Sequence, residues 1–173
     1  MHFASYICYG VANVGGTPKP KRRSGCPVSI SLEIFGDRWS LLVIRDLMVR
    51  GFCTFKEFEN SGEGIATNIL ANRLRRLEAA EIITQGAQNA DKRRVYYRLT
   101  EKGIDLAPVL LDLLIWGSRH EEADAPCAII ENMAANREQI LAEVRRRWEQ
   151  HDSTPLLPWL SGSADRPQIT RKK

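Results

Sequence analysis

Long hydrophobic runs are missing from this sequence of 173 residues. No stretch approaches the roughly 20 consecutive apolar residues that a membrane-spanning helix needs. The mildly apolar residues 1–16 have no Lys or Arg before their apolar part, so they lack the pattern of a secretory signal. We therefore expect a cytoplasmic protein with no membrane partner.

Metal-binding motifs are missing as well. No two cysteines have C-x-x-C spacing, and the histidines do not cluster with them: Cys8, Cys26, Cys53 and Cys127, with His2, His120 and His151. We expect no metal site, no cofactor and reduced thiols. A cysteine nucleophile needs a histidine base, and His120 and Cys127 fall on different expected elements. We therefore expect no catalytic residues and no enzyme.

The formal net charge of +4 is unevenly distributed along the chain. Residues 1–25 carry +4, residues 26–65 carry −2 and residues 66–98 carry +4, while residues 99–160 carry −5 and residues 161–173 carry +3. We expect 1–25 to be a flexible basic N-terminal extension. A basic block inside the folded middle favours a polyanionic partner more specifically than basic tails do.

Capping residues predict three helices before residue 61: 27–36, 37–51 and 54–60. Pro27 stands at a first-turn position, Asp37 is suited to an N-cap, and Gly51 stops the second helix. Thr54 and Glu57 have the spacing of a capping box.

A fourth helix is expected at 66–80, because Leu70, Leu74 and Leu77 share one side of it at 100° per residue. Short helix, turn and second helix have the proportions of a helix-turn-helix. Two strand signals follow, 82–85 and 95–99, joined by a turn-rich basic loop. A helix-turn-helix followed by a basic hairpin predicts a winged helix, in a mainly α fold with a small β-hairpin (α+β).

Two further helices are expected after the hairpin. Residues 100–117 begin with Thr100 as N-cap, and apolar residues nearly encircle this helix, so we expect a partner subunit to cover it. Residues 124–150 predict one long amphipathic helix that adds to the same dimerisation interface. The remainder, 153–173, is predicted to be a flexible tail.

Three blocks of the sequence closely resemble the HxlR-type winged helix-turn-helix regulators, bacterial transcription factors related to the MarR group. They are CPVSISLEIFGDRWSLLVIRDL (26–47), GIATNILANRLRRLEAAEII (64–83) and RRVYYRLTEKGIDLAPVLLDLLIWG (93–117). The resemblance covers 26–124 and implies a homodimer that binds operator DNA and often responds to a small-molecule or electrophile effector. The C-terminal helix, 125–152, lies outside the shared domain.

The resemblance implies two sets of DNA contacts. The recognition helix would use Thr67, Asn68, Ala71, Asn72, Arg75 and Arg76, and the wing would use Lys92, Arg93 and Arg94. Asn pairs bidentately with adenine and Arg with guanine, while wing cations clamp phosphates or enter the minor groove. We expect Arg98 to face the same way as the wing cations, and Arg73 to form a structural ion pair. The competing interpretation is a solvated surface with chance asparagines.

Three positions depart from the family pattern. Members often have Ser at Ala66 and Thr or Ser at Ala71, so we expect Thr67 to cap the recognition helix instead. Members tend to have Gly at Glu81, where a left-handed residue other than Gly costs roughly 1 kcal/mol. We therefore expect this helix to end differently.

Cys26 stands just before the first helix, where several family members have a redox or electrophile sensor. A helix N-terminus favours the thiolate, and Cys127 is a possible second thiol. The alternative is that Cys26 is a small buried hydrophobe. For the aromatic side chains of Trp39, Trp116 and Phe55, we expect core packing rather than an effector pocket.

The sequence therefore predicts a DNA-binding transcriptional regulator. We expect a repressor that binds double-stranded DNA at a pseudo-palindromic operator as a homodimer, and that is associated with the nucleoid through this binding. The alternative is a winged-helix protein-interaction module without specific DNA binding. That alternative predicts that removing Asn72 and Arg75 has no effect.

Overall fold

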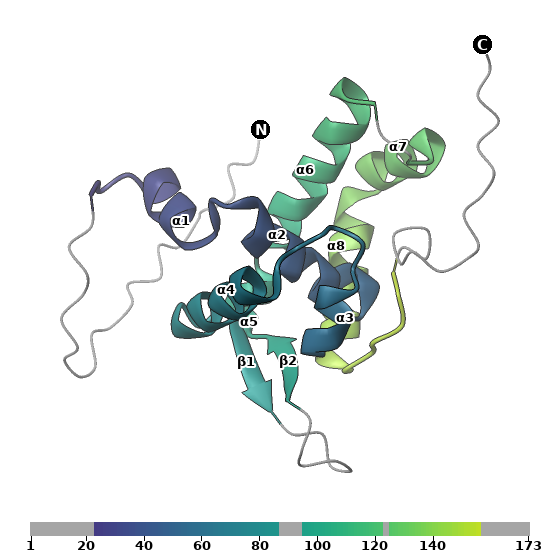
Figure 1. Ribbon diagram of the computed structural model, residues 1–173. Coiled ribbons are helices and arrows are strands. Elements are labelled where there is room, and N and C mark those ends of the chain that lie inside the picture. The colour runs from purple at the N-terminus through teal and green to yellow at the C-terminus, as the bar shows by residue number, and fades with distance from the viewer. Residues whose placement is uncertain (1–22, 87–94, 123–124, 157–173) are drawn as a thin grey trace.

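The computed structural model describes residues 23–86, 95–122 and 125–156 (Figure 1). Its elements are, in order, α1 (Pro27–Phe35), α2 (Arg38–Arg45), the π-helix η1 (Asp46–Arg50), α3 (Phe55–Glu59), α4 (Thr67–Ala79), β1 (Ile83–Gly86), β2 (Tyr96–Leu99), α5 (Glu101–Ile104), α6 (Ala107–His120), α7 (Cys127–Ala135) and α8 (Arg137–Glu149). The predicted mainly helical fold with one small hairpin is confirmed.

The caps predicted for the first helices are present. Pro27 opens α1, and the Asp37 carboxylate accepts a hydrogen bond from the Ser40 backbone N–H at 3.1 Å. Thr54 and Glu57 form the reciprocal capping box at the start of α3. Gly51 follows η1 with φ 72°, and a Cβ there would lie 1.8 Å from the Ser153 carbonyl oxygen. Glycine is therefore required at position 51 for both conformation and space.

Helices α2 and α4 bury their apolar stripes against each other in the main core. Leu70, Leu74 and Leu77 of α4 are at most 1% exposed, as their spacing predicted. They pack with Val43 and Ile44 of α2. This packing fixes the side of α4 that faces the protein, and hence the side that faces solvent.

Helix α4 ends in a left-handed turn, and the prediction of a different ending is wrong. Glu81 has φ 58°, its N–H donates to the Glu78 carbonyl, and the Ile82 N–H donates to the Leu77 carbonyl, both at 2.9 Å. This pair of bonds is the Schellman motif. Ile82 is 2% exposed and β1 begins at Ile83, so burial holds the turn despite the missing glycine.

Strands β1 and β2 form an antiparallel hairpin with Ile83 opposite Leu99 and Gly86 opposite Tyr96. Figure 1 shows the hairpin extending away from the end of the molecule that carries the α6–α7 turn. Residues 87–94 at the hairpin tip lie outside the described residues. The hairpin has the position of a wing beside α4, which it contacts through β1.

The single helix predicted at 100–117 is two helices, α5 and α6, separated by Asp105 and Leu106. Pro108 is in the first turn of α6, where a proline starts a helix and cannot continue one. Thr100 does cap α5, because its hydroxyl accepts a bond from the Gly103 N–H. The start of α6 therefore depends on its own proline rather than on continuation of α5.

The single helix predicted at 124–150, the core of the expected C-terminal helix 125–152, is also two helices, α7 and α8. They meet at Asn136, whose backbone leaves helical geometry at φ −111° and ψ 36°. The Asn136 side-chain amide donates to the Asn132 carbonyl at 2.9 Å. Such a bond competes with the backbone pattern of a helix and favours a break.

The C-terminal helices return to the winged domain of their own chain. Val144 of α8 is buried in the main core, and the Trp148 indole N–H donates to the Leu99 carbonyl at 2.8 Å. The Leu156 N–H donates to the Val49 carbonyl at 2.8 Å. Residues 153–156 are therefore held by the domain and do not belong to the flexible tail expected from position 153.

Candidate DNA-binding surface

The outward face of α4 carries the polar side chains that the sequence singled out. The structure exposes Thr67, Asn68, Asn72, Arg75 and Arg76, and half-buries Ala71. The leucines on the opposite face are fully buried. One helix therefore has a side fixed in the core and a side that reaches solvent with amides and guanidinium groups.

The two asparagines keep their amide donors available. The Asn68 side-chain oxygen accepts from the Ile69 N–H at 2.9 Å, and the Asn72 side-chain oxygen accepts from Arg73 at 3.4 Å. Among the described residues, neither amide NH₂ has a hydrogen-bond partner. Amide donors and acceptors on an exposed helix are the groups that read adenine in the major groove.

Thr67 does not cap the recognition helix, contrary to the prediction. The N-cap is Ala66, which offers no side-chain acceptor, and the Thr67 hydroxyl donates instead to the Glu59 carboxylate at 2.8 Å. This bond joins the start of α4 to the end of α3. Thr67 therefore ties the two helices of the helix-turn-helix together.

Three arginines of α4 have different roles in the structure. Arg73 forms the predicted ion pair, with its Nε 2.8 Å from the Asp37 carboxylate. Arg76 donates to the Glu33 carbonyl of α1 at 3.0 Å, and Arg75 makes only a 3.3 Å bond to Ala71 in its own helix. Of the three, Arg75 is the side chain that makes no hydrogen bond or ion pair to another described element.

The pKa of Asp37 reflects its position at the junction of α2 and α4. Burial raises it, but the hydrogen bonds from Ser40 and the charge of Arg73 outweigh burial and lower it overall. The carboxylate is therefore charged at neutral pH and holds Arg73 away from the exposed face.

The Arg98 side chain packs against the C-terminal end of α8, and the expectation that it faces the same way as the wing cations stays a prediction. Its guanidinium donates to the Trp148 carbonyl at 2.5 Å, contacts the His151 ring, and lies 5.4 Å from the Trp148 ring centroid. The wing cations Lys92, Arg93 and Arg94 lie outside the described residues. Arg98 therefore joins strand β2 to the C-terminal helix.

A buried ion network supports the turn before α4, and the sequence reasoning missed it. Asp46 is 2% exposed and accepts bonds from Arg45 at 2.6 and 2.9 Å, while Arg50 lies 3.3 Å from the same carboxylate. Arg50 donates to the Ser61 carbonyl at 2.9 Å, and Arg45 donates to Glu63 at 2.8 Å. Burial raises the pKa of Asp46, and the two arginines oppose that rise. The signal was an acid and a base four residues apart in an apolar helix.

The cysteines differ in exposure. Cys26 is exposed at the N-cap of α1, and Cys127 is exposed at the first residue of α7. Cys53 is half-buried, and burial together with the Glu57 carboxylate raises its pKa to about 11. The alternative that Cys26 is a buried hydrophobe is therefore wrong, and Cys53 is a poor nucleophile.

The aromatic side chains meet the packing expectation in part. Trp39 and Phe55 pack against the main core. Trp116 is 56% exposed on α6, so the prediction of core packing is wrong for this residue. An indole exposed to that extent needs another explanation, because large apolar side chains in contiguous exposed patches mark contact surfaces.

Metal sites and membrane spans are both absent from the described residues. Nowhere in 23–86, 95–122 and 125–156 do three or more His, Cys, Asp or Glu side chains gather as a metal site would need. Over the same part of the chain, no helix combines the length and the apolar character needed to cross a membrane.

The winged helix-turn-helix class of DNA-binding proteins is defined by a helix-turn-helix with a buried inner face and a polar outer face, followed by a two-stranded wing. Residues 34–125 match the family model described as HxlR-like helix-turn-helix, and the chain belongs to this family. The predicted resemblance is confirmed.

Relatives with known names support the same assignment. The chain is 33% identical to the HTH-type transcriptional regulator YodB of Bacillus subtilis (strain 168), over 66% of this chain and 96% of YodB. It is 31% identical to YybR, another HTH-type transcriptional regulator of that organism, over 58% of this chain and 79% of YybR. The chain is therefore a DNA-binding transcriptional regulator, as predicted.

Two solved structures resemble the fold. The transcription factor candidate PA1607 has 37% sequence identity and a TM-score of 0.55, covering 59% of this chain and 70% of PA1607. The redox regulator HypR in its oxidised form has 31% identity and a TM-score of 0.51, covering 57% of this chain and all of HypR (100%). Both likenesses cover little more than half of this chain.

Proposed function

We propose that this regulator is a repressor that binds a pseudo-palindromic operator as a homodimer, with α4 in the major groove and the wing on flanking phosphates. The observation that carries the proposal is the arrangement of α4. Its leucines are buried in the core, while Asn68, Asn72 and Arg75 face solvent with few protein contacts. A helix positioned this rigidly presents its outer side chains in one orientation, which base recognition requires.

The homodimer is supported by apolar side chains that the described chain leaves uncovered. On α1, Val28 is 66% and Leu32 59% exposed; on α6, Leu113 is 47% and Trp116 56% exposed. A symmetric interface through α1 and α6 would cover them. The two-fold symmetry of such a dimer predicts a pseudo-palindromic operator, with half-sites about one DNA turn apart.

The test is fluorescence anisotropy with the DNA upstream of the chain's own gene, random duplex as competitor, and two salt concentrations. Replacing both Asn72 and Arg75 by Ala should weaken specific binding by about 1–3 kcal/mol per side chain and leave competitor binding nearly unchanged. Arg146→Ala is the matched control, because Arg146 is exposed on α8 and pairs with Glu143.

Full tolerance of the double substitution would contradict the proposal and favour the protein-interaction module. Removing a wing cation, Lys92, Arg93 or Arg94, should act differently. It should weaken binding to all sequences and lower the salt slope by about 0.9 for each phosphate that the variant no longer neutralises. On this proposal the protein acts by binding alone, in the cytoplasm at the nucleoid.

Cys26 is proposed as the thiol through which oxidants act on DNA binding. It is exposed at the start of α1, which carries part of the proposed dimer surface. Oxidation by diamide would join two thiols in a disulfide, transferring two electrons and two protons to diamide. Cys26→Ser should keep operator binding after diamide treatment, while the control Cys53→Ser, which removes a half-buried thiol of raised pKa, should still lose it. Loss of binding in the Cys26→Ser protein would refute this role.

A further inference from the structure

The side of α2 that faces away from the helix-turn-helix core lines an apolar cavity. Its lining side chains recur three or four residues apart along α2 and η1: Arg38, Leu41, Leu42, Arg45, Met48 and Val49. Val43 and Ile44, on the other side, are buried against α4. Helix α2 therefore separates the DNA-reading half of the molecule from this cavity.

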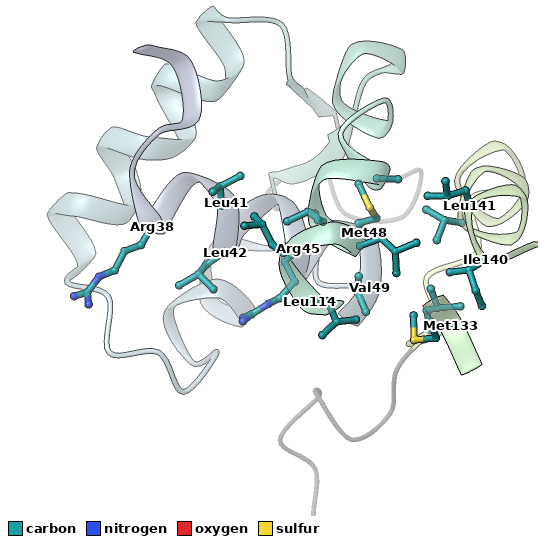
Figure 2. Close-up of a pocket in the computed structure, with 16 residues that line it drawn as sticks. Arg38, Leu41, Leu42, Arg45, Met48, Val49, Leu114, Met133, Ile140 and Leu141 are labelled. Carbon is teal, nitrogen blue, oxygen red and sulfur yellow. The ribbon is translucent and has the colours of Figure 1, made fainter. Parts of the chain in front are cut away.

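The cavity has a volume of about 370 Å³, and its walls come from α2, η1, α6, α7 and α8 and from Leu156 after α8 (Figure 2). Leu114 of α6 lies across from α2, and Met133 of α7 with Ile140 and Leu141 of α8 form the far end. This volume is within the range of roughly 300–1,000 Å³ that is typical of ligand sites.

Much of this far end lies outside the shared domain. Met133, Ile140 and Leu141 come after residue 125, where the family match ends, and so does Leu156, which also lines the cavity. Its lining is aliphatic, with two flexible methionines and no aromatic ring. The far end of the cavity is thus closed by residues outside the family match, and the lining suits an aliphatic group.

The polar residues of the lining are two arginines with different partners. Arg45 is neutralised by Asp46 and Glu63. Arg38 is exposed, lies 4.1 Å over the Trp39 ring, and within the described ranges has no carboxylate partner. In Figure 2 Arg38 stands at the end of the stripe farthest from Met133 and Ile140. The cavity therefore has an apolar end and a cationic end.

We propose that this cavity binds a small amphipathic carboxylate, with its aliphatic chain against Met133, Ile140 and Leu141 and its carboxylate at Arg38. A guanidinium recognises a carboxylate through charge and a fork of N–H donors. The inference adds an effector class to the proposed regulator and rests on that function only for its biological consequence. Binding itself does not require DNA.

Helix α2 connects the site to the recognition helix. The Asp37–Arg73 ion pair joins the start of α2 to α4, and Arg45, in the cavity wall, bonds to Glu63 in the turn before α4. A ligand that moves α2 therefore acts on two of the contacts that position the recognition helix.

The test is isothermal titration calorimetry of the full-length protein with decanoate, below its micelle concentration and without DNA. We expect saturable binding of one decanoate per protomer, and binding of uncharged 1-decanol that is weaker by about fivefold. Arg38→Gln should weaken decanoate binding by about the same factor, since Arg38 is an exposed charge. Arg146→Gln, which removes another exposed arginine, from α8, should change nothing.

A second variant tests the cavity itself. Leu42 lines the cavity and belongs to neither core, so Leu42→Trp should fill the space while circular dichroism shows an unchanged fold. Decanoate binding should then be abolished. Absence of saturable decanoate binding to the wild type, or equal binding by the Leu42→Trp protein, overturns the inference. Equal affinity for 1-decanol and decanoate overturns carboxylate recognition.

A second copy of the chain is the rival occupant. Analytical sedimentation at each step of the titration shows whether the protein stays a dimer while decanoate binds. If decanoate binds only when the dimer dissociates, a second copy of the chain occupies the cavity and the inference is overturned. The proposed function is tested separately by DNA anisotropy. If the protein binds decanoate as expected but binds no operator, the proposed repressor function is refuted and the proposed ligand site stands. If it binds an operator but no decanoate, only the ligand site is refuted.

Discussion

Helices α4 and α6 are nearly equal in length, 13 and 14 residues, but their outer faces differ. α4 buries its leucines completely and turns amides and guanidinium groups to solvent. α6 buries Ala107, Leu111 and Ile115 and leaves Leu113 and Trp116 about half exposed. The apolar side of α4 is fully covered by its own chain, whereas α6 keeps an apolar face that the described residues leave exposed.

The largest expected effect tests how firmly the buried leucines anchor α4 in the core. Leu74→Ala removes a side chain that is 1% exposed and should lower the free energy of unfolding by about 3 kcal/mol at any protein concentration. Urea denaturation at two protein concentrations measures this. A decrease below about 1 kcal/mol would show that α4 is not anchored as its burial indicates.

The next effect tests whether the exposed apolar face of α6 forms the dimer interface. Leu113→Asp puts a charge on the proposed interface and should weaken the dimer by about 2 kcal/mol, or roughly thirtyfold. Sedimentation equilibrium measures the dissociation constant. Val95→Asp is the control, because Val95 is 48% exposed on the hairpin rather than on α6. If the two variants associate equally well, α6 does not form the dimer surface.

The smallest effect compares the ends of the two helices. Glu81 follows α4 with φ 58°, whereas Glu121 follows α6 with φ −125°. Glu81→Gly should therefore stabilise the fold by about 0.5–1 kcal/mol, and Glu121→Gly should give no gain. Thermal unfolding of both variants would show the difference. A gain from Glu121→Gly as large as that from Glu81→Gly would contradict the argument.

The features that the sequence predicted correctly are local ones. The caps at Asp37 and Thr54 and the leucine stripe of α4 depend on neighbours within four residues. The breaks at Asp105–Leu106 and Asn136 were missed, because apolar periodicity continues across both while backbone geometry does not. Periodicity reports which residues face a core, and not whether one helix or two carry them.

Long-range partners account for what the sequence could not show at the site. Arg98 alternates with the wing cations in sequence, but Trp148, fifty residues later, supplies its acceptor. Glu81 tolerates a left-handed turn because Ile82 is buried. The exposed face of α4 was predictable because its position follows from the buried face, whereas the network around Asp46 needed the fold to bring Ser61 and Glu63 to it.

The close approach of Ser153 to Gly51 has a consequence for synthesis on the ribosome. Two further bonds tie the same C-terminal segment to the winged domain, from Trp148 to Leu99 and from Leu156 to Val49. A nascent chain that has emerged only to residue 125 contains the whole family domain but none of these contacts. Contacts this distant in sequence form late. The regulator should therefore reach its full protease resistance only after residue 156 has left the exit tunnel.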